Sequence, residues 1–425
     1  MTGPSLLAPT TAEPLATALS ALIVAVAAPY LALLLLALRD VARAGPPGRA
    51  APLPGPPPSV SVVVPAHDEE RSLPALIDAL QQQRYDGPVE FVLVDDRSRD
   101  RTGALIRAAA DEDRRVVPVR IDRPDRRAAP KVHAVARGIR ASCGEIVLTT
   151  DADCVPPPGW IDAMVRHLGA DGTMVVGTVE TALPDGRRGW VQRLEAIDWL
   201  ALMLVSRTLA RSGRALASSA NNQGYRRAAF EAAGGFGATR RAPSGDEDLL
   251  VQRLGRLPGA RIVFAGEPDA RVRTEPSPSW WAFLGQRRRW VSRYRHAVHY
   301  RPSFLAMMGL LAAQSATLAA AVVALPWLPQ AAPAVASAFA AQVAVQAYGV
   351  ARGARQFGRH DLVGPELLAW AVLYPFVVAT VTVLAFARSG EWRAGAAPYR
   401  RRWWRRRVRT VLRAFPTGPG RRDGR

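Results

Sequence analysis

Long apolar segments lie near both ends of the chain, on either side of a central region with a different pattern. The first covers residues 15–38, and three more follow at 304–325, 331–350 and 366–387. About 20 apolar residues cross a bilayer as a helix, which predicts membrane spans in the first, second and fourth segments. The alanine-rich third segment is less apolar, and we expect it to be re-entrant or half-inserted.

Charges around these segments predict their orientation. Arg39, Arg43 and Arg49 follow the first segment, whereas residues 1–14 contain no basic residue. Because positive charge stays on the cytoplasmic side, we expect the N-terminus outside and the central domain in the cytoplasm. A cleavable signal peptide is the alternative, although it would begin with positive charge. The pattern therefore predicts a multi-pass protein of the inner cell membrane.

The central region alternates short β-branched runs with helical stretches. Apolar runs at 60–64, 91–94 and 146–148 are separated by amphipathic segments, which predicts an α/β fold with a parallel sheet covered on both faces. In such folds, ligands bind beyond the carboxyl ends of the strands. Residues 45–58, rich in proline and glycine, precede this region and are predicted to form a semi-rigid spacer.

Composition excludes one class of partner. Lys and Arg total 56 against 36 Asp and Glu, which gives a net charge of +20. Seven arginines between residues 400 and 409 follow the last apolar segment, as is typical of a site for anionic membrane lipids. No nucleic-acid-binding motif occurs, so we expect lipid and no nucleic acid as the partner. Two cysteines are too few for a disulfide framework.

Acidic residues end two of the predicted strands. Asp151 and Asp153 follow the run at 146–148, and two carboxylates separated by one residue suit Mg²⁺ or Mn²⁺. Asp95 and Asp96 end the preceding strand, where carboxylates can accept hydrogen bonds from a base and a ribose. In isolation, a solvated turn explains Asp151 and Asp153 better than a metal site does, and a polar turn is also the alternative for Asp95 and Asp96.

Further candidates carry charge in unusual settings. Lys131 is the only lysine among 56 basic residues, and a compact ammonium facing a diphosphate would explain the exception, although chance retention is the alternative. Asp246 and Asp248 precede a helical stretch, where they could also cap the helix. The segment 286–290 could be an exposed basic face, or could place an arginine and an indole over a diphosphate and an acceptor.

Taken in this order, these segments resemble family 2 glycosyltransferases and their membrane-bound branch, which includes cellulose and hyaluronan synthases and ceramide glucosyltransferase. The resemblance covers about residues 59–290. It rests on seven segments: VSVVVPAHDEE, VLVDDRSRDRT, PKVHAVARGI, TTDADCVPPPGW, NNQGYRRAAFEAAGGF, SGDEDLLVQRL and QRRRW.

The resemblance implies a GT-A fold, a Rossmann-like nucleotide-binding domain, joined to transmembrane α-helices. It implies a nucleotide-sugar site in which Pro65, Ala66 and Glu69 lie near the nucleoside, Asp95 and Asp96 bind uracil and ribose, and Lys131 faces the diphosphate. It also implies that Asp151 contacts ribose and metal, that Asp153 coordinates Mg²⁺ or Mn²⁺, and that Asp246, or else Asp248, is the catalytic base. Gln286, Arg289 and Trp290 match the Q-x-x-R-W motif of the membrane-bound branch.

These expectations predict an inverting glycosyltransferase that moves a sugar from a UDP-sugar to a membrane-associated lipid acceptor by single displacement. A processive polysaccharide synthase is the alternative, and a non-catalytic membrane scaffold is a third possibility. The predicted organisation is an N-terminal extension (1–14), a transmembrane helix (15–38), a proline-rich linker (39–58), the GT-A domain (59–300), a membrane region (301–388) and a cytoplasmic arginine-rich tail (389–425).

Overall fold

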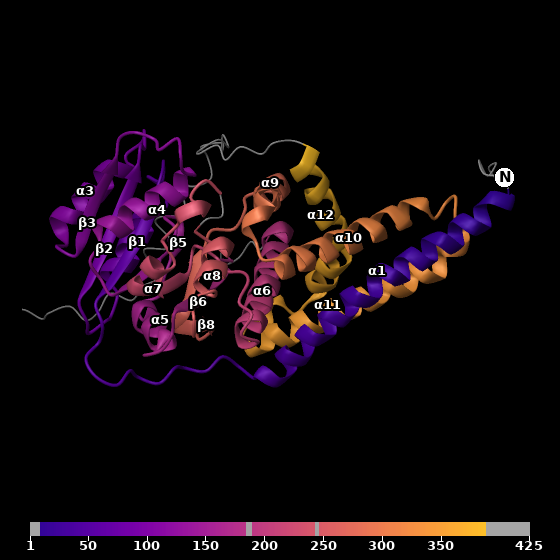
Figure 1. The fold of residues 1–425 in the computed structure, drawn as a ribbon, viewed down its shortest axis with the longest axis horizontal. Coiled ribbons are helices and arrows are strands. Elements are labelled where there is room, and N and C mark those ends of the chain that lie inside the picture. The colour runs from indigo at the N-terminus through magenta and orange to yellow at the C-terminus, as the bar shows by residue number, and fades with distance from the viewer. Residues whose placement is uncertain (1–8, 184–188, 243–245, 388–425) are drawn as a thin grey trace, which may run out of the picture. The chain divides into compact units, whose positions relative to one another are not determined.

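The structure, a computed structural model, describes residues 9–183, 189–242 and 246–387. Its ribbon shows a sheet with helices on both faces and a group of long helices (Figure 1). The predicted tail, 389–425, lies outside the described residues.

The strands are β1 (Val60–Ala66), β2 (Val89–Asp96), β3 (Val116–Ile121), β4 (Ile146–Thr149), β5 (Cys154–Val155), β6 (Met174–Thr181), β7 (Gln223–Arg226), β8 (Ile262–Ala265) and β9 (Arg271–Thr274). The α-helices are α1 (Pro9–Ala44), α2 (Leu73–Gln81), α3 (Thr102–Glu112), α4 (Pro130–Ala141), α5 (Trp160–Leu168), α6 (Trp190–Arg211), α7 (Arg227–Ala232), α8 (Asp248–Leu254), α9 (Trp280–Ser292), α10 (Pro302–Ala324), α11 (Ala332–Gln356) and α12 (Pro365–Ala387).

The sheet is parallel where the sequence predicts it and mixed beyond. In the described part, its strands follow the order β3-β2-β1-β4-β7-β6-β9-β5, with β8 beside β6. The first four run parallel, whereas β7 lies antiparallel to both β4 and β6. Residues of β1 alternate between two cores: Val62 packs with α2, α3 and α5 on one face, and Val63 packs with α4 and α8 on the other. Both faces are therefore covered, as predicted.

Helix α4 approaches the sheet closely because of one glycine. A Cβ on Gly138 would lie 2.4 Å from Cγ1 of Val63 and 2.9 Å from Cγ2 of Val94. Only a residue without a side chain allows this approach, which brings the first turn of α4 toward the ends of β1 and β4.

Helix α6 lies between the sheet and the long helices. Its apolar residues recur at helical spacing, a pattern that fits a core helix and a helix on the membrane interface equally well. Leu194, Ile197 and Leu204 of α6 pack in one cluster with residues of α1, α11 and α12, whereas Trp199 and Met203 pack with Val179 of β6. Its buried contacts on both sides make it a core helix.

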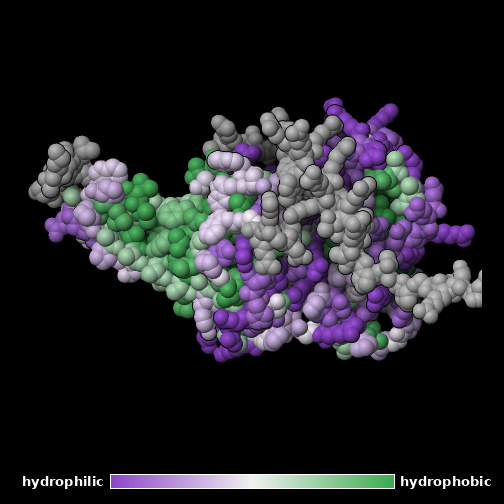
Figure 2. Space-filling view, turned by 180° about the vertical axis from the view of Figure 1, so that it is seen from behind, coloured by the Kyte–Doolittle hydropathy of each residue, from purple (hydrophilic) through white to green (hydrophobic). Residues whose placement is uncertain are grey.

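Among the described residues, four helices are long and apolar enough to cross a membrane: Ala12–Ala44, Pro302–Ala324, Pro329–Gln356 and Pro365–Phe386. Figure 2 shows hydrophobic residues gathered over the long helices, while the sheet domain is mostly hydrophilic. The alanine-rich segment, expected to be re-entrant or half-inserted, forms the unbroken helix α11. The first helix extends beyond 15–38 at both ends, because hydropathy marks the part inside a bilayer rather than the ends of a helix.

Residues 45–58 form no helix or strand, as the spacer prediction requires, yet both ends of the segment are bonded to the domain. The Arg207 guanidinium donates to the Gly45 carbonyl at 2.7 Å, and the Tyr85 hydroxyl donates to the Pro58 carbonyl at 2.5 Å. The spacer is therefore held against the domain.

A buried acid on α6 joins three helices. Asp198 accepts a hydrogen bond from Nε of Arg287 on α9 at 2.6 Å, and one from Nε1 of Trp370 on α12 at 3.3 Å. The side chains of Asp198 and Arg287 are only 10% and 9% exposed, so little water screens this pair. It ties α9 to a candidate membrane helix.

We expect Asp198→Ala to destabilise the protein strongly, because it leaves the buried Arg287 guanidinium without a carboxylate. Removing one member of a buried ion pair costs about 3–5 kcal/mol. Thermal unfolding of the purified chain in detergent measures the loss. Asp162→Ala is the control, since the Asp162 side chain is 40% exposed and its pair with Arg166 is worth about 1 kcal/mol or less. Equal unfolding temperatures for the two variants would contradict the role of Asp198.

Candidate active site

The loops that follow β1 and β2 bind each other. The amides of Asp68 and Glu69 donate to the hydroxyls of Ser98 and Thr102, at 3.1 and 2.8 Å. In return, the Arg99 amide donates to the Asp68 carboxylate at 2.7 Å. Because β1 and β2 are parallel neighbours, their carboxyl ends meet at one edge, and these bonds fix that edge.

Asp95 and Asp96 are buried at this edge and have partners within the protein. Asp95 accepts a hydrogen bond from the Ser98 amide at 2.9 Å and pairs with Arg120. Asp96 binds Arg97 with both carboxylate oxygens, at 2.8 and 3.0 Å. Pro65 and Ala66 end β1 beside them. To contact uracil and ribose, these carboxylates would have to bind the nucleoside alongside Arg97 and Arg120 or in place of them. Those contacts stay a prediction.

Lys131 joins two of the predicted acids. Its ammonium, in the first turn of α4, lies 2.8 and 2.9 Å from the two oxygens of Asp151 and 3.8 Å from Asp246. Burial opposes the charge of Lys131, but the carboxylates of Asp151 and Asp246 outweigh burial and raise the pKa of the ammonium. Lys131 is therefore a fixed cation at the end of β4.

A second group of acids lies beside Asp151. Burial, and after it the charge of Asp151, raises the pKa of Asp153. Burial raises the pKa of Glu69 to about 7, with further contributions from Asp153, Asp151 and Glu275. Negative charge is therefore concentrated where the sequence predicts a cation.

The donor set at this place suits a hard divalent cation in part. Asp151 and Asp153 supply carboxylate oxygens, the ligands that Mg²⁺ and Mn²⁺ prefer. Within the described residues, no group of three or more His, Cys, Asp or Glu could hold a metal. The protein would thus supply two carboxylates, and the diphosphate of a bound nucleotide and water would have to complete the coordination.

The two candidate bases differ in their surroundings. Asp248 accepts a hydrogen bond from the Ser218 amide at 3.2 Å and lies 3.7 Å from Arg293, which also pairs with Glu247. Asp246 is 1% exposed, and neither of its carboxylate oxygens has a hydrogen-bond partner within the described residues. Burial raises the pKa of Asp246 to about 6 against the opposing charge of Lys131. Burial also raises the pKa of Asp248, to about 7, so the two acids are distinguished by the missing hydrogen-bond partners of Asp246 and not by their pKa values.

The predicted Q-x-x-R-W residues lie on α9, whose following residue Arg293 reaches Glu247. Arg289 is one turn before Arg293, so it faces the same side of the helix. Among the described residues, Arg289 has no ion-pair partner.

The other two residues of the motif pack against Arg287. The Trp290 ring lies 4.0 Å from the guanidinium carbon of Arg287 and packs edge-on against Trp199, with 5.2 Å between the ring centroids. Gln286 accepts from Arg287 at 2.7 Å.

The structure thus groups Glu69, Lys131, Asp151, Asp153 and Asp246, with Asp248 beside them through Arg293. Sequence reasoning missed Arg293, Glu275 and Gln223, whose side-chain amide donates to the Asp246 carbonyl at 2.6 Å. Glu275 lies near Asp153 because β9 pairs with β5, where Thr274 is opposite Cys154. This pairing of distant strands has no local signal in the sequence.

This arrangement defines a class of fold: a GT-A-like mixed α/β domain accompanied by four long apolar helices. A mannosyltransferase from Pyrobaculum calidifontis, solved in complex with GDP-Man and Mn²⁺, has this fold. The similarity covers 86% of this chain and 99% of that one, with a TM-score of 0.53 and 23% identity. A likeness at this identity shows the fold alone.

Residues 61–234 match the family described as Glycosyl transferase family 2, so the chain contains a domain of that family. An undecaprenyl-phosphate 4-deoxy-4-formamido-L-arabinose transferase of Pectobacterium carotovorum is 38% identical over 130 residues, which are 30% of this chain and 38% of the relative. The transferase of the same name from Pseudomonas aeruginosa is 39% identical over 139 residues, 32% of this chain and 40% of the relative. The match spans about two fifths of these curated relatives.

The raised pKa of Asp246 predicts that the protein loses stability as pH rises. The pKa of Asp246 is about 6 in the folded state, against 3.8 for an ordinary aspartate. At pH values between these two, the folded state therefore binds the proton more tightly than the unfolded state does. Stability therefore falls as pH rises through this window, and the loss is complete above about pH 6. We expect Asp246→Asn, which carries no charge, to unfold at a higher temperature than the parent at pH 8.

The gain amounts to at most about 3 kcal/mol, since one pKa unit is worth about 1.4 kcal/mol. The difference between variant and parent should be smaller at pH 5, and Asp111→Asn on exposed α3 surface is the control. A lower unfolding temperature for Asp246→Asn at pH 8 would mean that attraction to Lys131 outweighs the cost of burial.

Proposed function

We propose that this chain is a membrane-anchored, inverting glycosyltransferase that moves a sugar from a nucleotide-sugar donor, UDP-linked by our prediction, to a lipid acceptor. The observation that carries the proposal is the contact of Lys131 with Asp151 and Asp246. It places a fixed cation for a diphosphate next to a buried acid that can take a proton. The family match over residues 61–234 supports the same chemistry.

The reaction follows from these side chains. A carboxylate oxygen of Asp246 takes the proton of the acceptor hydroxyl, whose oxygen attacks the anomeric carbon of the sugar. The bond from that carbon to the diphosphate breaks, and the nucleoside diphosphate leaves with the electron pair. Lys131 and Arg289 stabilise the charge on the departing diphosphate. One displacement inverts the anomeric centre, and no sugar–enzyme bond forms.

A divalent cation would be held by Asp153 and Asp151. Bound there, Mg²⁺ or Mn²⁺ supplies positive charge that neutralises the diphosphate. The raised pKa of Asp153, caused by burial and by Asp151, supports this assignment, because a nearby cation would relieve both acids.

The acceptor group could be a lipid hydroxyl or a lipid phosphate, and the two differ in their need for a base. A lipid hydroxyl must lose a proton to become a nucleophile, and Asp246, whose pKa burial raises to about 6, is suited to take it at neutral pH. A phosphate monoester has its second pKa near 6 and is ionised already at pH 7, so it needs no such base. Asp246 therefore favours a hydroxyl-bearing lipid, whereas the names of the two transferase relatives favour an undecaprenyl-phosphate-like acceptor.

Two other readings compete. A processive polysaccharide synthase would need a channel for its polymer, and four candidate membrane helices offer little material for one. A non-catalytic scaffold would have no need for the buried Asp246, whose carboxylate oxygens accept no hydrogen bond within the described residues. The length of the product separates the synthase from a single transfer, and nucleotide-sugar turnover separates both from the scaffold.

The base assignment predicts the effect of Asp246→Asn. Loss of a general base lowers rates by about 10²–10⁴-fold. We expect a fall in kcat of at least about a hundredfold with a hydroxyl lipid, while the donor Kd from calorimetry stays nearly the same. With a polyprenyl phosphate acceptor, the same variant should retain most of its rate. If Asp248→Asn abolishes turnover and Asp246→Asn does not, the base is Asp248.

The proposed function is tested first in membranes that contain the protein. Membranes are incubated with Mn²⁺ or Mg²⁺ and a panel of radiolabelled nucleotide sugars, and lipids are then extracted. We expect label in the organic phase with the intact chain and none with Asp153→Ala. Label only in insoluble polymer would show a polysaccharide synthase. No label from any donor, together with no nucleotide binding by calorimetry, would favour the scaffold.

A further inference from the structure

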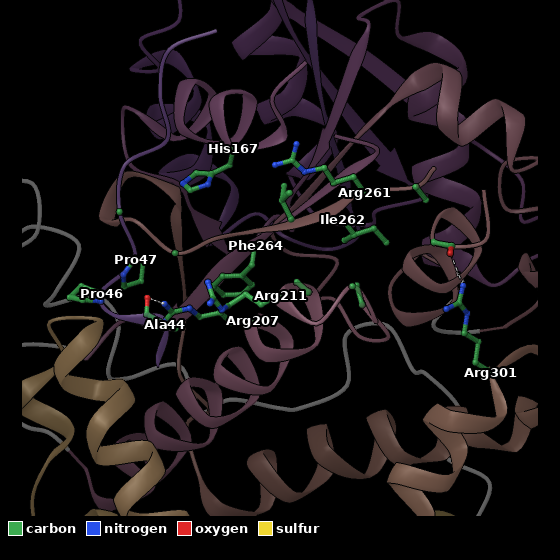
Figure 3. Close-up of a pocket in the computed structure, with 18 residues that line it drawn as sticks. Ala44, Pro46, Pro47, His167, Arg207, Arg211, Arg261, Ile262, Phe264 and Arg301 are labelled. Carbon is green, nitrogen blue, oxygen red and sulfur yellow. Dashed lines mark hydrogen bonds between the residues drawn. The ribbon is translucent and has the colours of Figure 1, made fainter. Parts of the chain in front are cut away.

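A cavity of about 620 Å³ lies away from the candidate active site. It is lined by the end of α1 and the residues after it, by the last turn of α6, and by the first residues of β8 (Figure 3). Strand β8 is parallel to β6, which runs in the same direction as β4 because both are antiparallel to β7. The first residues of β8, which line the cavity, therefore lie at the opposite ends of the strands from Asp151 and Asp246.

The lining of this cavity is strongly basic. Arg207, Arg211, Arg261 and Arg301 contribute to it, and no lining residue is acidic. Arg211 is paired with Asp40 at 3.1 Å. Arg207 donates to the carbonyls of Ala44 and Gly45, and Arg301 donates to that of Gly255. Within the described residues neither forms an ion pair, although the charge of Asp40 also acts on Arg207.

Arg261 is the arginine most available to a ligand. It precedes β8, is exposed, and within the described residues its guanidinium has no hydrogen-bond or ion-pair partner. Figure 3 shows its side chain beside Ile262 in the lining. Guanidinium groups bind phosphate through parallel N–H donors, so several of them around one cavity favour a phosphate-bearing anion.

The apolar helices indicate the source of that phosphate. Ala44 ends α1, Arg301 immediately precedes α10, and Arg207 donates to Gln356 at the end of α11 at 3.0 Å. Three candidate membrane spans thus begin or end around this cavity. Ile262 and Phe264 add apolar surface to the lining. A lipid combines a phosphate with apolar chains and is present at the ends of membrane helices.

We propose that this cavity binds the phosphate headgroup of an anionic membrane lipid. The site is separate from the proposed sugar-transfer site, and the proposal does not depend on catalysis. Arg261 holds the phosphate, and Arg207 keeps α1, α6 and α11 together around it.

The test measures lipid binding to the purified full chain in neutral detergent. Native mass spectrometry counts bound phosphatidylglycerol and gives the Kd of the first bound lipid. Arg261→Glu reverses the charge at the cavity, and Arg256→Glu is the matched control, because Arg256 is also exposed but does not line the cavity. The arginine-rich segment 400–409 is present in both proteins, so its own lipid binding cancels in the comparison.

We expect Arg261→Glu to weaken the first phosphatidylglycerol by about tenfold or more, as loss of a charge-assisted contact does, and Arg261→Gln to weaken it less. Equal Kd values for Arg261→Glu and Arg256→Glu would overturn the site. Displacement of the lipid by inorganic phosphate at a similar concentration would assign the cavity to a soluble phosphate and overturn the lipid source.

Discussion

The candidate active site depends on one ammonium group held among carboxylates. After burial, the charge of Asp151 contributes to the raised pKa values of Asp153, Asp246 and Glu69, and Lys131 is the cation that contacts Asp151 and Asp246. Without a ligand, Lys131 is occupied by Asp151. A divalent cation at Asp151 and Asp153 would take over this neutralisation and leave the ammonium free for a diphosphate, so cation and donor would bind cooperatively.

The fold brings these groups together from distant parts of the chain. Gly138 allows α4 to approach β1, which sets the height of Lys131 above the sheet. Asp151 follows β4 after one residue, and Gln223 on the neighbouring strand β7 holds the backbone of Asp246. Asn222 beside it accepts from Trp160 at 2.9 Å and donates to two carbonyls, so the support is fully hydrogen-bonded. The acids thus lie in turns that are supported by neighbouring strands and helices.

The sequence predicts those parts of the site that follow a strand. Acids after β2 and β4, the covered parallel sheet and the long apolar helices are all local patterns, and the structure contains them. Arg293 with Glu247, and Arg287 with Asp198, are pairs separated by 46 and 89 residues, and no local pattern connects them. The antiparallel β7 is equally hidden, because its four residues carry no alternation that fixes direction.

The helix that carries the Q-x-x-R-W residues is attached to the membrane helices as well as to the acids. On one side, Arg293 after α9 reaches Glu247 and Asp248, and on the other, Phe283 and Leu284 pack with Val381 of α12. Asp198 holds α9 and the start of α12 through the same carboxylate. Helix α9 thus connects a candidate membrane helix to the buried acids. In the proposed reaction, Trp290 on this helix would tolerate an apolar chain and Arg289 would bind the diphosphate.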